Sequence, residues 1–212
     1  MPPSTKIMSK RSNESEAFGT NQILRAFRRT YPESRVLQNV ILPLDNFGAC
    51  PTAEFDVIVV CMAGVYLFEI KGYDEGRIVI DKGPDGMQLW KINKISGPVD
   101  IPNPIAQGGR KIRYLRQSIP NCQIRGFVYF TSERITIPAD ISADVVTTAD
   151  LSYLPRVLRS DAKRRDRLLT VTTVNDIADS ILMLAEGHTM EEHIQNCLAT
   201  HKKPRTEGHA IH

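Results

Sequence analysis

The stretch FDVIVVCMAGVYLFEIKGY (residues 55–73) determines the expected fold class of this 212-residue chain. Residues 55–60 and 65–71 are rich in Val, Ile, Tyr and Phe, and the small Ala63-Gly64 pair lies between them, so the sequence predicts an antiparallel hairpin. Most positions of both strands are apolar on either face, which is typical of central strands in a layered α/β domain.

Charged residues interrupt this apolar hairpin at Asp56, Glu69 and Lys71. With either of the two possible two-residue turns, Asp56 lies opposite Glu69 or Lys71 and all three share one face, whereas Phe55 and Val57 share the other. Placing such charges at the end of buried strands costs several kcal/mol unless they pair or bind an ion. Two explanations stay open: a divalent metal held by the two carboxylates, with the lysine beside a phosphate or an attacking water, or a partly exposed cluster of ion pairs.

A helix is expected downstream of the hairpin. Trp90 is followed by a polar loop, and the helix then opens with Asn103 as its N-cap and Pro104 in its first turn. Gln107 falls one turn into this helix, where it can point back at the end of the sheet. The strand GFVYF (126–130) is predicted to follow.

The order of these motifs resembles a known family. The segment GACPTAEFDVIVVCMAGVYLFEIKGYDEGRI (48–78), then Trp90, NPIAQ (103–107) and a hydrophobic strand are similar to the nuclease-related domain (NERD), a branch of the PD-(D/E)XK nuclease superfamily. The similarity covers roughly residues 16–150. It implies a mixed central β-sheet flanked by helices, a restriction-endonuclease-like core, and DNA as the substrate.

The resemblance also implies residue roles. Asp56 and Glu69 would bind Mg²⁺ or Mn²⁺, Lys71 would be the catalytic lysine, and Gln107 would assist from the helix. The implied activity is metal-dependent hydrolysis of DNA, by an endonuclease or a nickase. The alternative is a catalytically degenerate domain that binds DNA or a protein partner. Domains of this type are often joined to kinase or helicase modules, including in anti-phage systems, so a fused or associated module of that kind is an expected partner.

The first helix departs from the family pattern. Many members carry Gly-Glu there, and the glutamate supplies another active-site carboxylate, but this chain has Gly19-Thr20. Glu16 lies one turn earlier on the same helix face and is the candidate replacement among the catalytic residues. Equally, Glu16 could only favour the start of the helix by its charge.

Basic residues follow Gln107 although the net charge is only +3. We expect Arg110, Lys111 and Arg113, on the same helix as Gln107, to contact DNA phosphates. A later basic run, residues 163–167, is interpreted as a solvated helix face.

The cysteines and histidines show no familiar metal-binding spacing. Histidines occur only after residue 187, and His188 and His193 are predicted to lie on an exposed helix face. Cys61, beside the hairpin turn, is expected to be a small buried residue. The pattern argues against a zinc site and suits a reducing cytoplasm, with four scattered cysteines, Cys50, Cys61, Cys122 and Cys197.

Composition divides the chain into four expected segments. These are a disordered tail (1–13), the nuclease-related domain (14–150), a helical C-terminal extension (151–200) and a linker or tail (201–212). Within the extension, one helix is expected to be broken by Pro155 and a second to be capped by Asn175 and ended by Gly187. The longest apolar stretch is too short to cross a membrane and the polar start lacks a signal peptide, so we expect a cytoplasmic protein without a membrane partner.

Overall fold

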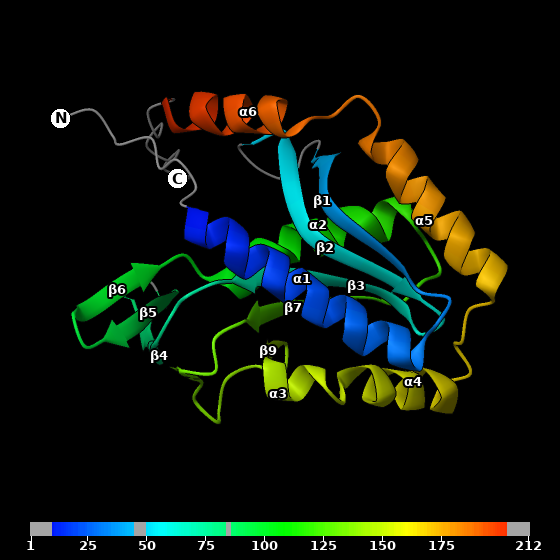
Figure 1. The fold of residues 1–212 in the computed structure, drawn as a ribbon. Coiled ribbons are helices and arrows are strands. Elements are labelled where there is room, and N and C mark those ends of the chain that lie inside the picture. Colours follow the sequence, from blue (N-terminus) through cyan, green and yellow to red (C-terminus); the bar gives the residue numbers. More distant parts are fainter. Residues whose placement is uncertain (1–9, 45–49, 84–85, 203–212) are drawn as a thin grey trace, which may run out of the picture.

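The computed structural model describes residues 10–44, 50–83 and 86–202, which form two mixed β-sheets flanked by helices (Figure 1). The first sheet has the order β1-β2-β3-β7-β9, with β1 (Arg35–Pro43), β2 (Thr52–Cys61), β3 (Gly64–Lys71), β7 (Ile124–Phe130) and β9 (Val145–Thr147). The second has the order β6-β5-β4-β8, with β4 (Gly76–Lys82), β5 (Gln88–Lys94), β6 (Gly97–Ile101) and β8 (Ile135–Thr136). Strands β1 to β3 are antiparallel, whereas β3, β7 and β9 are parallel. The predicted mixed α/β class is confirmed.

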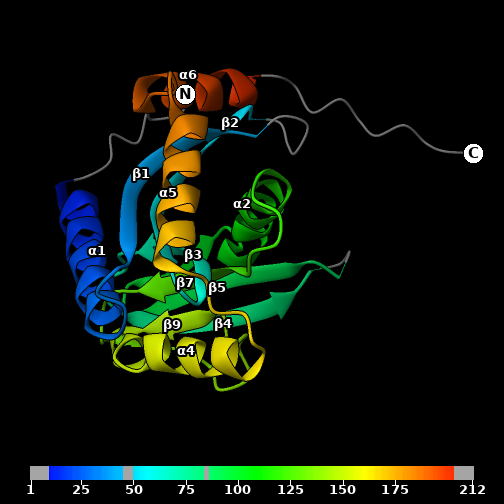
Figure 2. The ribbon, with the colours of Figure 1, turned by 90° about the vertical axis from the view of Figure 1, so that its right-hand side faces the viewer.

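Helices cover both faces of the first sheet. They are α1 (Lys10–Thr30), α2 (Pro104–Ser118), α3 (Thr148–Leu151), α4 (Leu154–Arg164), α5 (Val171–Ala185) and α6 (Met190–Lys202). Figure 2 shows the sheet between α1 on one side and α2 on the other, with α6 lying across the top. Among the described residues, no helix combines the length and apolarity needed to cross a membrane.

The central hairpin forms as predicted. Its turn is Met62-Ala63, because Cys61 pairs with Gly64, and the antiparallel register continues to Val57 opposite Phe68. Continued by one step, this register would place Asp56 opposite Glu69, one of the two predicted pairings, and the Asp56 side chain accepts the N–H of the next residue, Ile70, at 2.7 Å. The alternation had left Glu69 and Lys71 open as partners, and the turn decides between them.

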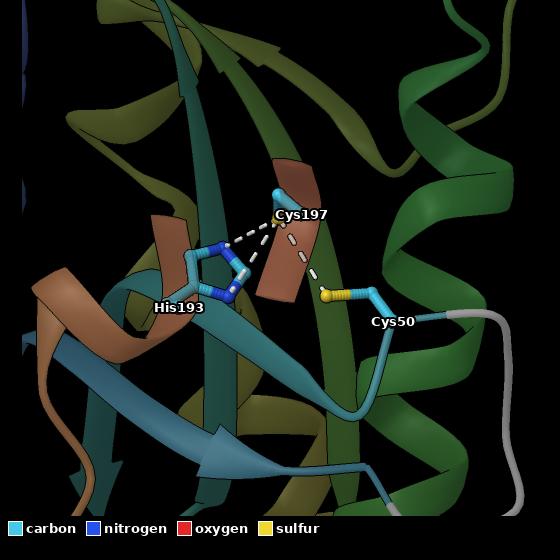
Figure 3. Close-up of side chains that lie close together, drawn as sticks. All are labelled: Cys50, His193 and Cys197. Atoms are coloured by element: carbon cyan, nitrogen blue, oxygen red, sulfur yellow. Dashed lines mark hydrogen bonds between the residues drawn. The ribbon is translucent and has the colours of Figure 1, made fainter. Parts of the chain in front are cut away.

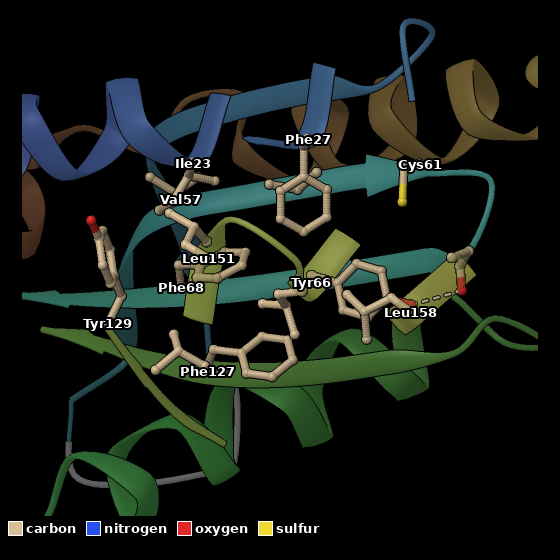
Figure 4. Close-up of a cluster of buried hydrophobic side chains, with 14 of the residues drawn as sticks. Ile23, Phe27, Val57, Cys61, Tyr66, Phe68, Phe127, Tyr129, Leu151 and Leu158 are labelled. Carbon is tan, nitrogen blue, oxygen red and sulfur yellow. Dashed lines mark hydrogen bonds between the residues drawn. The ribbon is translucent and has the colours of Figure 1, made fainter. Parts of the chain in front are cut away.

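An aromatic cluster fills the face of the sheet under α1, α3 and α4 (Figure 4). The Phe27 ring packs edge-on against Phe68 with centroids 5.7 Å apart, and Phe68 stacks on Phe127 at 5.3 Å. Leu154 and Leu158 of α4 belong to the same cluster. The helices after residue 150 are thus part of the core that supports the hairpin.

The opposite face is covered by α2 and α5, and it contains Phe55. This corrects the prediction that Phe55 shares a face with Val57. In β1, Gln38 pairs with Val57 and Val40 pairs with Phe55, and Asn39 lies between them. Asn39 has φ 51°, a left-handed conformation that disturbs the alternation of faces. The strands consequently change orientation next to Asp56.

Two glycines allow α1 to approach the end of β3 closely. A Cβ atom on Gly19 would lie 2.9 Å from Cγ2 of Thr131 and 3.0 Å from Cγ2 of Ile70. A Cβ atom on Gly72 would lie 2.5 Å from Cβ of Ser15. A Cβ atom at either position would force the neighbouring side chains to shift, so the two glycines allow the first turns of α1 to lie close beside the hairpin.

The second sheet corrects the expected polar loop after Trp90. Strand β5 carries Trp90 and pairs with β6, so most of the expected loop is a hairpin. Trp90 is 1% exposed and Ile92 is fully buried, while their neighbours Leu89 and Asn93 are exposed. This two-residue alternation signals a strand, but the many polar residues obscured it.

The ends of the helices differ from two expectations. Pro155 lies in the first turn of α4 and so starts this helix rather than breaking it. Helix α5 is capped by Thr170, whose side chain accepts the Thr173 N–H, while the Asn175 side chain accepts a bond from Arg35 at 3.2 Å. Gly187 has φ 82° just after α5, as expected for a helix terminator.

The expected tails fall largely outside the described residues. This applies to residues 1–9 and 203–212. However, α1 begins at Lys10 and α6 continues to Lys202, so residues 10–13 of the first expected tail and 201–202 of the second are helical.

Candidate active site at the ends of β2 and β3

Glu69 is bonded to two lysines. Its Oε1 accepts a hydrogen bond from Nζ of Lys71 at 2.9 Å, and its Oε2 accepts one from Nζ of Lys111, on α2, at 2.6 Å. The three side chains are only 15–22% exposed. The carboxylate is therefore fixed in orientation by positive charge on both oxygens.

Asp56 lies in a less favourable environment than Glu69. Its Oδ2 accepts the Ile70 N–H at 2.7 Å. Burial and the Glu69 carboxylate raise the pKa of Asp56 above its ordinary value. Burial would raise the pKa of Glu69 too, but the Lys111 and Lys71 ammonium groups outweigh it and lower that pKa. Of the two carboxylates, Asp56 is thus the one whose ionised form is less stabilised by the lysines.

Two further carboxylates lie near this pair. Burial, Asp56 and Glu69 raise the pKa of Glu16, so the first turns of α1 bring Glu16 within electrostatic range of the hairpin. Thr20, at the position expected for a glutamate, is 6% exposed. Burial and Glu16 raise the pKa of Glu54. Glu54 was not among the site residues expected from the sequence. Glu54 lies two residues before Asp56, and this strand spacing predicts that both side chains point to the same face.

We call this group the carboxylate site: Glu16, Glu54, Asp56 and Glu69, with Lys71 and Lys111. Its oxygens are the hard donors that Mg²⁺ and Mn²⁺ prefer. Burial, and after it neighbouring carboxylates, raise the pKa of three of the four carboxylates, Glu16, Glu54 and Asp56. By the chemistry of its oxygens, the donor set is of the kind that holds a divalent cation.

Helix α2 forms another side of the site. The Asn103 side chain accepts the N–H groups of Ile105 and Ala106 at 3.0 and 3.1 Å, so it caps α2 as predicted. Gln107 and Arg110 line a pocket of about 440 Å³ together with Glu54, Asp56, Glu69 and Lys111.

The three expected DNA contacts on α2 lie in different surroundings. Arg110 is exposed at the pocket, and Arg113 is exposed without lining it. Lys111 points inward to Glu69 and is 15% exposed, so its side chain is part of the carboxylate site rather than of the outer helix face. Spacing along a helix does not reveal this inward turn, because a lysine stem can follow apolar surface such as the Phe55 ring, 5.4 Å from its Nζ.

The same pocket contains a second group, the thiol cluster of Cys50, His193 and Cys197 (Figure 3). This corrects the interpretation that the cysteines are scattered and that His193 lies on a merely exposed helix face. Cys61 is fully buried, as expected. The sequence signal was the His-x₃-Cys spacing, which puts both side chains on one face of α6.

Comparison with known proteins identifies the family. The family model described as "Nuclease-related domain" matches residues 14–131, more than half of the chain. No curated protein and no solved structure matches the chain.

Proposed function

The chain belongs to the nuclease-related domain family, and on this premise we propose that it is a metal-dependent deoxyribonuclease that hydrolyses phosphodiester bonds at the carboxylate site. The observation that carries the proposal is that Asp56 and Glu69 of one hairpin line the same pocket as Gln107 and Arg110, while Lys71 of that hairpin is bonded to Glu69 at 2.9 Å. An ion-pair cluster with only a structural role would not need several carboxylates in excess of their lysines.

In this proposal, Asp56 and Glu69 hold Mg²⁺ or Mn²⁺, and Glu16 adds a further carboxylate. The cation would polarise the scissile phosphate. The Lys71 ammonium stabilises negative charge that develops on this phosphate as water attacks phosphorus and the bond to the leaving sugar oxygen breaks. Gln107 orients a reactant from α2. Lys111 is a positioning residue, because its bond to Oε2 of Glu69 fixes the carboxylate.

DNA would enter along α2. Arg110 and Arg113 supply backbone contacts on its exposed side, and such contacts are independent of base sequence. On the family resemblance alone, we propose a wider role in DNA processing or anti-phage defence, with a fused or associated kinase or helicase module.

The alternative function is a degenerate domain that binds DNA or a protein partner without cleavage. Two observations favour it: the buried Thr20 replaces a carboxylate of the family, and both oxygens of Glu69 are already bonded to ammonium groups.

Incubation with supercoiled plasmid separates the two functions. We expect Mn²⁺ to support conversion to nicked or linear DNA, and EDTA to prevent it. Glu69→Gln should abolish conversion, whereas the control Glu75→Gln should retain it, because Glu75 pairs with Arg134 outside the pocket. Retention of plasmid in a gel shift without cleavage at any Mn²⁺ concentration would establish the degenerate alternative.

A further inference from the structure

The thiol cluster has the spacing of a metal site. The ligand atoms of Cys50, His193 and Cys197 all lie within 4.8 Å of one another. The two Sγ atoms are 3.6 Å apart, and Sγ of Cys197 is 3.6 Å from Nε2 of His193. A tetrahedral ion with bonds of about 2.3 Å to sulfur and about 2.0 Å to nitrogen separates two sulfurs by about 3.8 Å, and sulfur from nitrogen by about 3.5 Å. Figure 3 shows the three side chains converging from α6 and from the segment before β2.

The imidazole of His193 has an oxygen partner for its second ring nitrogen. Nδ1 of His193 lies 2.9 Å from Oγ1 of Thr52, a residue that is 3% exposed. Asn196 also donates to this hydroxyl, at 3.2 Å. Metal-bound histidines usually donate their second ring N–H to an oxygen, which leaves the other nitrogen unprotonated. A bond from Nδ1–H to Thr52 would leave Nε2 unprotonated and able to bind a metal ion, and Sγ of Cys197 lies 3.6 Å from Nε2 and 3.9 Å from Nδ1.

We propose that Cys50, His193 and Cys197 bind one Zn²⁺ ion that fixes α6 against the start of β2. Two thiolates and an imidazole are soft to borderline ligands, which favour Zn²⁺ over the Mg²⁺ or Mn²⁺ of the carboxylate site. Three protein ligands leave the fourth position to water. Binding displaces the two thiol protons to solvent, with no change of oxidation state.

The zinc site has a structural consequence for the pocket. Cys50 and Cys197 are 147 residues apart in sequence, and both line the pocket that contains Asp56 and Glu69. The ion would close this long loop and hold α6 as one pocket wall. Without the ion, α6 retains the hydrogen bonds of His193 and Asn196 to Thr52, so we expect it to detach more readily rather than to unfold.

Metal analysis of the purified chain tests the proposal. We expect one zinc per chain, lost in Cys50→Ser, Cys197→Ser and His193→Gln, and retained in the control Cys122→Ser, since Cys122 is a half-buried free cysteine outside the cluster. Replacement of zinc by Co²⁺ in the wild type should give a thiolate-to-cobalt charge-transfer band. This measurement does not depend on the folding of any variant.

Three results would overturn the proposal: no zinc in the wild type after exposure to Zn²⁺, a Co²⁺ spectrum without the sulfur band, or a disulfide between Cys50 and Cys197 found by mass spectrometry of protein prepared with reductant. The test is independent of the proposed hydrolysis. Asp56→Asn should keep its zinc, so a loss of cleavage in this variant bears only on the carboxylate site, and a loss of zinc in Cys197→Ser bears only on the thiol cluster.

Discussion

Two walls of one pocket differ in chemistry and in origin. The carboxylate site is built mainly from one hairpin, in which Asp56 and Glu69 are 13 positions apart in the chain, whereas the thiol cluster joins residues separated by 147 positions. The first offers oxygen ligands, which suit hard cations, and the second offers sulfur and nitrogen ligands, which suit softer ones. Two groups of side chains in one pocket are thus brought together in different ways. The register of a hairpin assembles the carboxylate site, and the docking of α6 assembles the thiol cluster.

Loss of the lysine at the carboxylate site should have the largest effect. Lys71→Ala should lower cleavage about 10²-fold or more, because the developing phosphate charge loses its ammonium, while DNA affinity and zinc content stay nearly unchanged. The matched control is Lys91→Ala, since Lys91 is also a strand lysine in an ion pair, 2.9 Å from Asp81 of the second sheet. Single-turnover kinetics would measure the difference. Wild-type cleavage by Lys71→Ala would contradict the assigned role.

A substitution in α1 should cause a smaller loss of cleavage. Glu16→Gln should weaken Mn²⁺ binding by about 10-fold and reduce cleavage with it, without change in zinc content. Glu14→Gln, on the exposed side of the same helix, is the control. Titration calorimetry checks both. Thr20→Glu should not improve on the wild type, because Thr20 is 6% exposed and a carboxylate there would be buried. Equal Mn²⁺ affinity in Glu16→Gln and wild type would show that α1 contributes no metal ligand through Glu16.

Substitutions in the two sites should change the Tm in opposite directions. In chelated protein at neutral pH, Asp56→Asn should raise stability by about 1–2 kcal/mol, or roughly 2–8 °C in Tm. The asparagine keeps an acceptor for the Ile70 N–H and removes a poorly compensated charge. Because the folded pKa of Asp56 is raised, its ionisation opposes folding, so this gain should vanish at low pH and grow as pH rises through the folded pKa. Cys197→Ser should instead lower Tm, and only when zinc is supplied. A Tm gain that is independent of pH would contradict this explanation.

The smallest expected effect concerns DNA approach. Arg110→Ala should weaken DNA binding equally on all sequences and reduce the slope of log K against log[salt] by about one. Lys163→Ala, at an exposed position of α4, should leave the slope unchanged. Lys111→Ala should mainly disturb Glu69, since its Nζ is 2.6 Å from Oε2. A salt titration by fluorescence anisotropy compares the three. Equal slopes for Arg110→Ala and Lys163→Ala would show that only net charge matters.

The sequence predicted what depends on neighbouring residues. The hairpin and the Asn103 cap follow from local patterns, and both are present, while the choice between the two possible turns was left to the structure. The exchange of faces at Phe55 was missed because it depends on the backbone of Asn39 in the next strand. Strand β6 was missed because its burial does not alternate: of its five residues only Ile101 is buried.

Contacts between distant segments were beyond local patterns. The inward turn of Lys111 depends on how α2 lies on β3, and the meeting of Cys50 with Cys197 depends on how α6 lies on β2. A His-x₃-Cys pair occurs on many helices, so it becomes informative only when a third ligand is brought to it by tertiary packing.

The distance of α6 from β2 along the chain also has a consequence during translation. At about 5–20 residues per second, Cys197 is synthesised about 7–30 s after Cys50. For that interval the nascent chain carries the Cys50 thiol and the acidic hairpin without the helix that will cover them. Throughout this interval the Cys50 thiol has neither of its two partners, so the thiol cluster can form only after α6 has been synthesised.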